Sequence, residues 1–176
     1  MTSSRYAHYE HERRFLVPPG EPFRDAIDTT TYRIVEDKYL PDTRLRLRRL
    51  TRVPTGERAH KLTRKEEPES PFSLRMTTLY ITEHEHKQLD SLEGHRLRKA
   101  RYNHLYLGHV FAIDVFEGPL DGLVLCSVEA DTFEALMAVP FPPFALRDVT
   151  ADPFFTGGNL CRITAEDLRR KLADHA

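Results

Sequence analysis

The chain has 176 residues, 30% of them charged, and a formal net charge of −1. This length fits one domain over residues 1–176, which can bury roughly two thirds of its unfolded surface. The balance of charge argues against a strongly basic nucleic-acid binder, and no apolar run is long enough for a membrane-spanning helix. The two cysteines lack the spacing of metal ligands and favour reduced thiols in a cytoplasmic protein.

The first predicted strand covers residues 9–17 and alternates charged with other side chains. Glu10, Glu12 and Arg14 share one face of it, because successive side chains of a strand point to opposite sides. Two carboxylates on one face can share a hard divalent cation, and an arginine beside them can hold an anion. The alternative is a half-buried strand whose polar face is in water, and for this strand alone that alternative is favoured.

The clearest alternation in the chain follows in a predicted strand over residues 43–50 and its return strand over 59–65, joined by a turn at 55–57. One face of this pair would carry five cations: Arg44, Arg46, Arg48, Lys61 and Lys65. Like charges directly opposite are destabilising, so such a row needs an anion or interleaved carboxylates to offset it. The alternative is a solvated edge protected against aggregation.

The rest of the chain predicts further short elements. Strands are expected over 32–40, 73–81, 97–108, 110–116 and 123–130, and helices over 21–27, 82–92, 131–136 and from Thr164 onward. Lys99 and Arg101 share one strand face. Asp114 is the one acid in an otherwise apolar strand, where a carboxylate is costly unless it is paired, hydrogen-bonded or bound to a metal. Glu129 is likewise the single carboxylate of its predicted strand. For Glu129, a structural role in capping N–H groups or in an ion pair is as well supported as a role in a site.

Taken together, these elements predict an α+β protein that is mainly antiparallel β, with flanking helices, and its roughly seven or eight strands suit a closed or nearly closed barrel. If the charged faces point inward, eight cations and four carboxylates line a polar tunnel. The cations are Arg14, Arg44, Arg46, Arg48, Lys61, Lys65, Lys99 and Arg101, and the carboxylates are Glu10, Glu12, Asp114 and Glu129. An excess of four positive charges calls for a compact polyanion such as a triphosphate group, whose oxygens arginine grips bidentately.

With these residues placed, the chain resembles the CYTH family, also called the triphosphate tunnel metalloenzymes. The family's Glu-x-Glu-x-Lys motif appears as Glu10-His11-Glu12-Arg13-Arg14, with arginine in place of lysine. The later pieces of the pattern follow in order: Leu45-Arg46-Leu47-Arg48, Leu62-Thr63-Arg64-Lys65, Lys99-Ala100-Arg101-Tyr102, Ile113-Asp114-Val115-Phe116, Val128-Glu129 and Asp148 to Pro153. The match spans nearly the whole chain, and it is specific as a set.

This resemblance implies a closed eight-stranded antiparallel barrel whose tunnel binds triphosphate compounds with Mg²⁺ or Mn²⁺. Family members hydrolyse inorganic triphosphate, thiamine triphosphate or RNA 5′-triphosphate, and some make cyclic AMP from ATP. The implied catalytic residues are Glu10, Glu12, Arg14 and Lys65. The implied metal ligands are Glu10, Glu12, Asp114 and Glu129, and the eight cations above are the implied phosphate-binding residues.

The chain also departs from the family pattern. Met76, Thr78, Ala112 and Ser127 stand where family members usually carry acids. The first hypothesis is therefore a metal-dependent triphosphatase. The alternative is a catalytically weakened or inactive binder of polyphosphate or nucleotide, and an adenylyl cyclase of class IV type ranks lower. The expected partner is a triphosphate-bearing small molecule, without membrane or nucleic acid, and a homodimer is left open.

Overall fold

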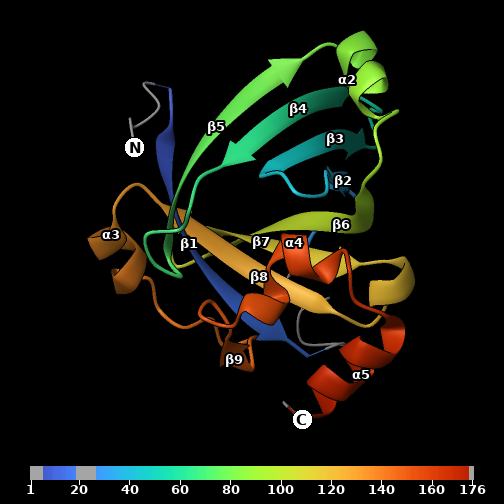
Figure 1. The fold of residues 1–176 in the computed structure, drawn as a ribbon. Helices are drawn as coiled ribbons and strands as arrows, with labels where there is room; N and C mark the ends of the chain where they lie inside the picture. Colours follow the sequence, from blue (N-terminus) through green and yellow to red (C-terminus); the bar gives the residue numbers. More distant parts are fainter. Residues whose placement is uncertain (1–5, 19–26, 175–176) are drawn as a thin grey trace.

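The computed structural model describes residues 6–18 and 27–174. Eight strands form a closed antiparallel barrel (Figure 1): β1 His8–Val17, β2 Tyr32–Tyr39, β3 Leu45–Val53, β4 Arg58–Lys65, β5 Ser73–Ile81, β6 His95–Tyr106, β7 His109–Phe116 and β8 Val124–Ala130. A short ninth strand, β9 Arg147–Asp148, pairs with β1. The predicted fold class is confirmed. The predicted helix over 21–27 falls almost wholly outside the described residues.

The strand order around the barrel is β5-β4-β3-β2-β6-β7-β8-β1, and β1 closes the ring by pairing with β5. This closure is short. Residues His8–His11 of β1 pair with Ser73–Met76 of β5, while the next part of β1, from His11 to Val17, pairs with β8. One strand therefore bridges both edges of the sheet, which brings the N-terminal Glu10 and Glu12 into the ring.

The outer face of β1, β7 and β8 carries one apolar core. Phe15, Phe111 and Ile113 are fully buried there. The core also contains Leu136 of α3 (Phe133–Ala138) and residues of the connector that follows it, so this helix and connector cover that face. Because the apolar side chains of these strands point outward into this core, their polar partners at alternate positions point into the barrel.

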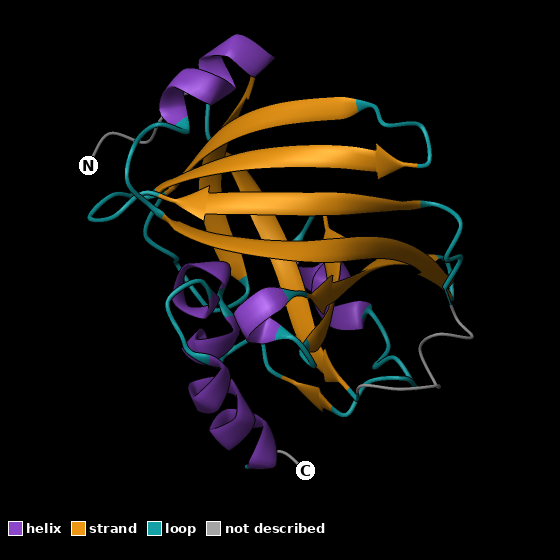
Figure 2. Ribbon diagram, turned by 90° about the vertical axis from the view of Figure 1, so that its right-hand side faces the viewer, coloured by secondary structure: helices purple, strands orange, loops and turns teal. Residues whose placement is uncertain are grey.

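A second apolar core closes one end of the barrel. The inward-facing Leu97, Phe116 and Leu125 pack there with Phe155 of the 3-10 turn η2 (Pro153–Phe155) and Leu160 of α4 (Gly157–Leu160). Helix α5 (Ala165–Ala173) and the 3-10 turn η1 (Gly118–Leu120) contribute to the same core. The C-terminal helices lie together beneath the barrel strands in Figure 2. The C-terminal segment, through Phe155 of η2 and Leu160 of α4, thus fills this end of the barrel and is called the plug below.

The predicted helix over 82–92 is shorter than expected. Helix α2 runs from Glu83 to Leu89 and begins with a capping box between Thr82 and Glu85. Gly94 lies beyond the end of this helix. A Cβ atom at Gly94 would lie 2.8 Å from the Tyr39 carbonyl oxygen and from the Lys38 side chain, so glycine is needed for close packing against β2. Among the described residues, no helix is long and apolar enough to cross a membrane.

Candidate functional site

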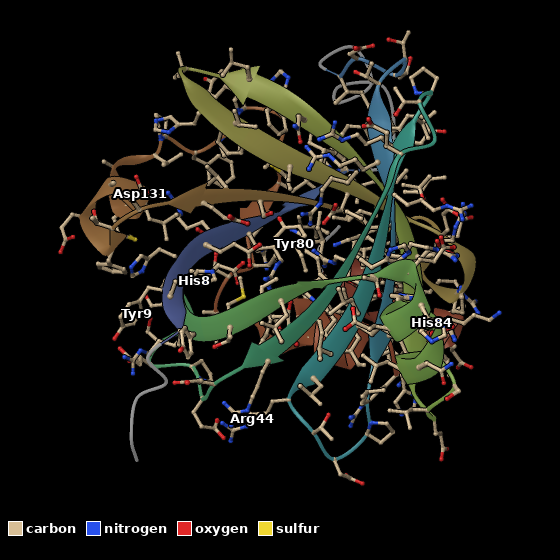
Figure 3. The ribbon with its side chains drawn as sticks, turned by 90° about the horizontal axis from the view of Figure 1, so that it is seen from above. His8, Tyr9, Arg44, Tyr80, His84 and Asp131 are labelled. Carbon is tan, nitrogen blue, oxygen red and sulfur yellow. The ribbon has the colours of Figure 1, made fainter. Side chains whose placement is uncertain are left out.

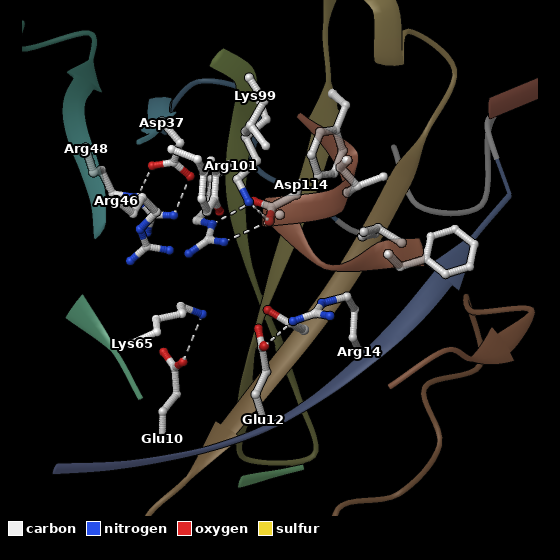
Figure 4. A pocket seen from close by; sticks show the side chains of 18 of the residues that line it. Glu10, Glu12, Arg14, Asp37, Arg46, Arg48, Lys65, Lys99, Arg101 and Asp114 are labelled. Atoms are coloured by element: carbon white, nitrogen blue, oxygen red, sulfur yellow. Dashed lines mark hydrogen bonds and ion pairs between the residues drawn. The ribbon is translucent and has the colours of Figure 1, made fainter. Parts of the chain in front are cut away.

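A polar cavity of about 80 Å³ lies inside the barrel. Side chains from seven of the eight barrel strands converge on it (Figure 4). Its polar lining consists of Glu10, Glu12, Arg14, Asp37, Tyr39, Arg46, Arg48, Lys65, Lys99, Arg101, Asp114, Ser127 and Glu129, and its apolar floor includes Phe116, Leu125, Phe155 and Leu160. The charged strand faces therefore converge on a common interior, as predicted from their alternation.

Asp37 of β2 and Arg48 of β3 form a bidentate pair in the wall of the cavity. Arg48 Nε donates to Asp37 Oδ1 at 2.5 Å and its terminal nitrogen donates to Oδ2 at 2.7 Å. Burial by itself would raise the pKa of Asp37, but the charge and hydrogen bonds of Arg48 outweigh burial and hold that pKa well below its usual range. Asp37 is thus a permanent anion inside the barrel.

Asp114 of β7 is held by two cations of β6. Arg101 donates to both of its carboxylate oxygens at 2.6 and 2.7 Å, and Lys99 Nζ donates to Oδ2 at 2.6 Å. These partners overcome the effect of burial and lower the pKa of Asp114. Burial lowers the pKa of Lys99 to about 8, with Asp114 opposing that shift. Both oxygens of Asp114 are therefore engaged by protein cations.

Two further ion pairs involve carboxylates of β1, one of them close and one loose. Glu12 pairs with Arg14 on the same strand, and the positive charges around Glu12 lower its pKa despite its burial. Glu10 lies 3.8 Å from Nζ of Lys65, which projects from β4. Burial lowers the pKa of Lys65, and Glu10 offsets part of that shift. Since the Glu10–Lys65 contact is beyond hydrogen-bond distance, a ligand could separate it at small cost.

Arg46 and Glu129 differ from the other charged residues of the cavity. Within the described part of the chain, neither forms an ion pair. Nε of Arg46 is buried without a hydrogen-bond partner, its terminal nitrogen lies 3.4 Å from the Thr63 hydroxyl, and its side chain also hydrogen-bonds with Tyr39. Desolvation by the surrounding protein raises the pKa of the Glu129 carboxyl, although the residue is exposed. The negative charges of Glu10 and Glu12 raise it further. A buried N–H group without a hydrogen-bond partner costs free energy, so a ligand that offers an acceptor oxygen to Nε of Arg46 would remove this cost.

The net charge of the cavity is lower than predicted. Six cations and five carboxylates line it, an excess of one rather than four. Arg44 is at the rim (Figure 3), where it pairs with Glu67. Lys61 lies over the ring of the exposed Tyr80, 4.6 Å from its centroid. These two cations do not line the cavity, and the unpredicted Asp37 does.

The candidate metal ligands fit a divalent ion in part. No three His, Cys, Asp or Glu side chains within the described ranges are grouped closely enough to hold a metal by themselves. Mg²⁺, however, is commonly held by one or two carboxylates together with substrate phosphates. Glu10 and Glu12 share a strand face, and Glu129 is directly opposite Glu12 in the β1–β8 register. One or two of these carboxylates together with phosphate oxygens would suit that mode, whereas Asp114 does not because its oxygens are engaged by Lys99 and Arg101.

Sequence reasoning missed Asp37 and Tyr39, although a signal for both was present. Asp37 and Arg48 are directly opposite each other across the β2–β3 turn, as Arg101 and Asp114 are across the β6–β7 turn. In an antiparallel hairpin, residues at equal distances from the turn are opposite each other, so the position of each turn in the sequence gives these pairs. Missing from the prediction as well was Gly157, which approaches the Tyr39 hydroxyl so closely that a Cβ there would lie 2.1 Å away.

A larger outer pocket of about 610 Å³ adjoins the cavity. The two share Glu10, Glu12, Arg14, Tyr39, Arg46, Lys65 and Gly157. The outer pocket continues between the β4–β5 connection, the start of β3 and the C-terminal segment around Pro153. The outer pocket is therefore continuous with the charged interior.

No family model and no curated protein matches the chain, but solved structures do. A structure of the inorganic triphosphatase NE1496 is 26% identical with a TM-score of 0.53, and the match covers 92% of this chain and 95% of that one. The chain has the CYTH-type tunnel fold. A second structure of NE1496 gives 27% identity, 88% and 99% coverage and a TM-score of 0.55.

Two more distant structures share the CYTH fold alone. A putative adenylate cyclase from Bacillus halodurans is 16% identical over 75% of this chain and 86% of its own, with a TM-score of 0.56. The protein PH1819 from Pyrococcus horikoshii OT3 is 20% identical over 73% of this chain and 82% of its own, with a TM-score of 0.54. The eight-stranded tunnel barrel is thus the common feature.

The departures from the CYTH pattern lie together in this barrel. Met76 is opposite Lys65, and Thr78 is opposite Thr63, to which it is hydrogen-bonded at 3.0 Å. Ala112 and Ser127 are opposite each other across β7 and β8. The β5 wall and the β7–β8 wall therefore lack carboxylates at these positions, and the acids of the cavity come from β1, β2, β7 and the end of β8.

Proposed function

We propose that this chain is a metal-dependent triphosphatase, which hydrolyses a triphosphate compound inside the barrel. The observation that carries the proposal is Arg46, a half-buried arginine whose Nε atom is buried without a hydrogen-bond partner and which has no carboxylate partner among the described residues; it lines a cavity beside Glu10 and Glu12. The likeness to the inorganic triphosphatase NE1496 over nearly its whole length supports the same reaction.

In this proposal the cations have separate tasks. Arg46 and Lys65 bind the phosphate oxygens, because their ion pairs are absent or loose, and Arg14 binds beside them while it stays paired with Glu12. Arg48 and Arg101 are already held by buried aspartates. They present their remaining N–H groups to the cavity at fixed positions. Binding and in-line orientation of the phosphate chain need no reorganisation of these groups, which is how preorganised charge lowers a phosphoryl-transfer barrier.

Glu10 and Glu12, with Glu129 opposite, would hold Mg²⁺ or Mn²⁺ together with the phosphates. When bound, such an ion neutralises charge on the phosphate oxygens. The low pKa of Glu12 keeps its carboxylate ionised and available for this purpose. Arg44 and Lys61, at the rim and beyond the cavity, would act on the approach of the anion rather than on the bound phosphates.

The test is phosphate release from tripolyphosphate, thiamine triphosphate and ATP with Mg²⁺ or Mn²⁺. Arg46→Ala should lower kcat/KM by at least ~100-fold, the usual cost of removing a preorganised donor. Arg52→Ala is the matched control, because Arg52 lies on the same strand and its side chain is 69% exposed in a pair with Glu57. Absence of phosphate release from every substrate with either metal would refute the proposal.

A second candidate is a binder without catalysis. Met76, Thr78, Ala112 and Ser127 favour it, because these four positions offer no carboxylate to a metal or an attacking water. Calorimetry with tripolyphosphate separates the two candidates. The binder predicts the same affinity with and without EDTA and no phosphate release, whereas the triphosphatase predicts weaker binding after EDTA.

A further inference from the structure

We infer that the triphosphate group recognised by this chain carries an organic substituent with an apolar ring, which lies in the outer pocket. This inference rests on the proposed function and specifies the substrate class. The charged cavity measures about 80 Å³, far below the usual size of a small-molecule site, whereas the outer pocket of about 610 Å³ falls within the usual range. The triphosphate compound must therefore extend from the first into the second.

The outer pocket differs chemically from the cavity. Beyond the residues that the two share, its walls include Leu45, Pro68, Phe72, Leu74 and Pro153. Small sites for organic molecules are lined mainly by such apolar groups with a few polar ones. The uncharged polar groups here are the hydroxyls of Thr43, Ser70, Ser73, Thr150 and Thr156.

The charges of the outer pocket give a longer phosphate chain little to bind. Apart from the shared residues, its charged lining consists of Arg44 and Glu66. Arg44 is paired with Glu67, and Glu66 lies within 4.0 Å of both Arg64 and Arg75. An inorganic chain that continued outward would lose water there without gaining a free cation. An apolar ring gains by leaving water.

The apolar wall is also held in place. The carbonyl oxygen of Phe72 accepts a hydrogen bond from the Glu12 amide at 3.0 Å, and its ring packs edge-on against Phe133 with centroids 6.1 Å apart. The wall is thereby fixed to β1, the strand that carries Glu10 and Glu12. A ligand whose phosphates reach Arg46 and Lys65 would place its substituent against this wall.

The experiment compares phenyl triphosphate with methyl triphosphate, which has the same charge and a much smaller substituent. Calorimetry on the full chain should give about tenfold tighter binding of the phenyl compound, because only its ring is large enough to bury against the wall. Leu45→Asn, a substitution of similar volume, should bring the two affinities to within about twofold of each other. Leu105→Asn, at a side chain 70% exposed on the β6–β7 hairpin, should keep the tenfold preference.

Phe72→Ala provides a second variant and should also reduce the preference. Equal affinities for the two compounds in the wild type, with tripolyphosphate still bound or hydrolysed, would overturn this inference and leave the triphosphatase proposal standing. No binding of any of the three compounds would overturn both.

Discussion

At the scale of single residues, the cavity is defined by which charges are paired. Two buried aspartates hold Arg48 and Arg101 with close bidentate hydrogen bonds, while Arg46 has no carboxylate among the described residues. A buried ion pair is weak evidence for stability, because desolvation offsets the attraction between the charges. Here the pairs have a different consequence. They keep arginines charged and oriented in a small space, so a second anion meets donors that are already in position.

Lys99 leads to a prediction for pH dependence. Burial lowers its pKa from 10.5 to about 8, and a triphosphate anion binds the protonated form. Affinity for tripolyphosphate should therefore fall roughly tenfold per pH unit above 8, as the proton is lost. Lys99→Arg keeps its charge in this range and should lose less affinity between pH 8 and 9. The dissociation constant of tripolyphosphate is measured for both proteins at each pH. Ionisation of the ligand affects both constants equally, so it drops out of their ratio.

The effect of the same group on folding has the opposite sign. Its pKa in the folded chain is below the ordinary value of 10.5, so between about 8 and 10.5 the unfolded chain binds more protons. The contribution of Lys99 to folding stability therefore rises with pH across this window.

Equal slopes of tripolyphosphate affinity against pH for the wild type and Lys99→Arg would contradict the assignment of the binding effect to Lys99.

At the scale of elements, the barrel contains two kinds of interior. The upper part is polar and is made by residues at alternate positions of the strands. The lower end is apolar because η2 and α4 insert Phe155 and Leu160 among Leu97, Phe116 and Leu125. This plug gives the cavity a dry floor, and charged groups next to such a floor interact more strongly than they would in water.

The plug should contribute to stability. Leu160 is 1% exposed, and Leu160→Ala should lower the free energy of unfolding by about 2–5 kcal/mol, because it leaves a cavity in a packed core. Urea unfolding followed by circular dichroism measures this change. Leu105→Ala, on an exposed hairpin, is the control and should change stability by less than about 0.5 kcal/mol. A similar small change for both variants would mean that the C-terminal segment does not pack into the barrel.

At the scale of the whole molecule, the nearly neutral chain concentrates opposite charges in the barrel. The closed ring prevents them from moving apart, since the strands that carry them are joined edge to edge by β1. A polyanion that binds only the folded barrel must then stabilise all of it at once.

This coupling predicts a thermal shift. Tripolyphosphate at about 100 times its dissociation constant should stabilise the fold by about 2.7 kcal/mol, equivalent to a rise in Tm of roughly 5–10 °C for a chain of this length. Differential scanning calorimetry measures the shift, with sulfate at equal ionic strength as the control. A shift of the same size in sulfate would show that the barrel does not distinguish a phosphate chain from a simple anion.

The sequence by itself determined the strands, their inward charged faces and the cations Arg46, Lys65 and Arg101, because alternation along a strand is a local property. Pairs across a tight turn, such as Asp37 with Arg48, were also within its reach, since a turn sets the register of the strands it joins. Only the tertiary structure decided which charges meet across the ring. It placed Glu10 beside Lys65, moved Arg44 and Lys61 out of the cavity and closed the floor with Phe155 and Leu160. These contacts join residues far apart in the chain, so they depend on how the barrel closes and how the C-terminal segment packs, which no local pattern specifies.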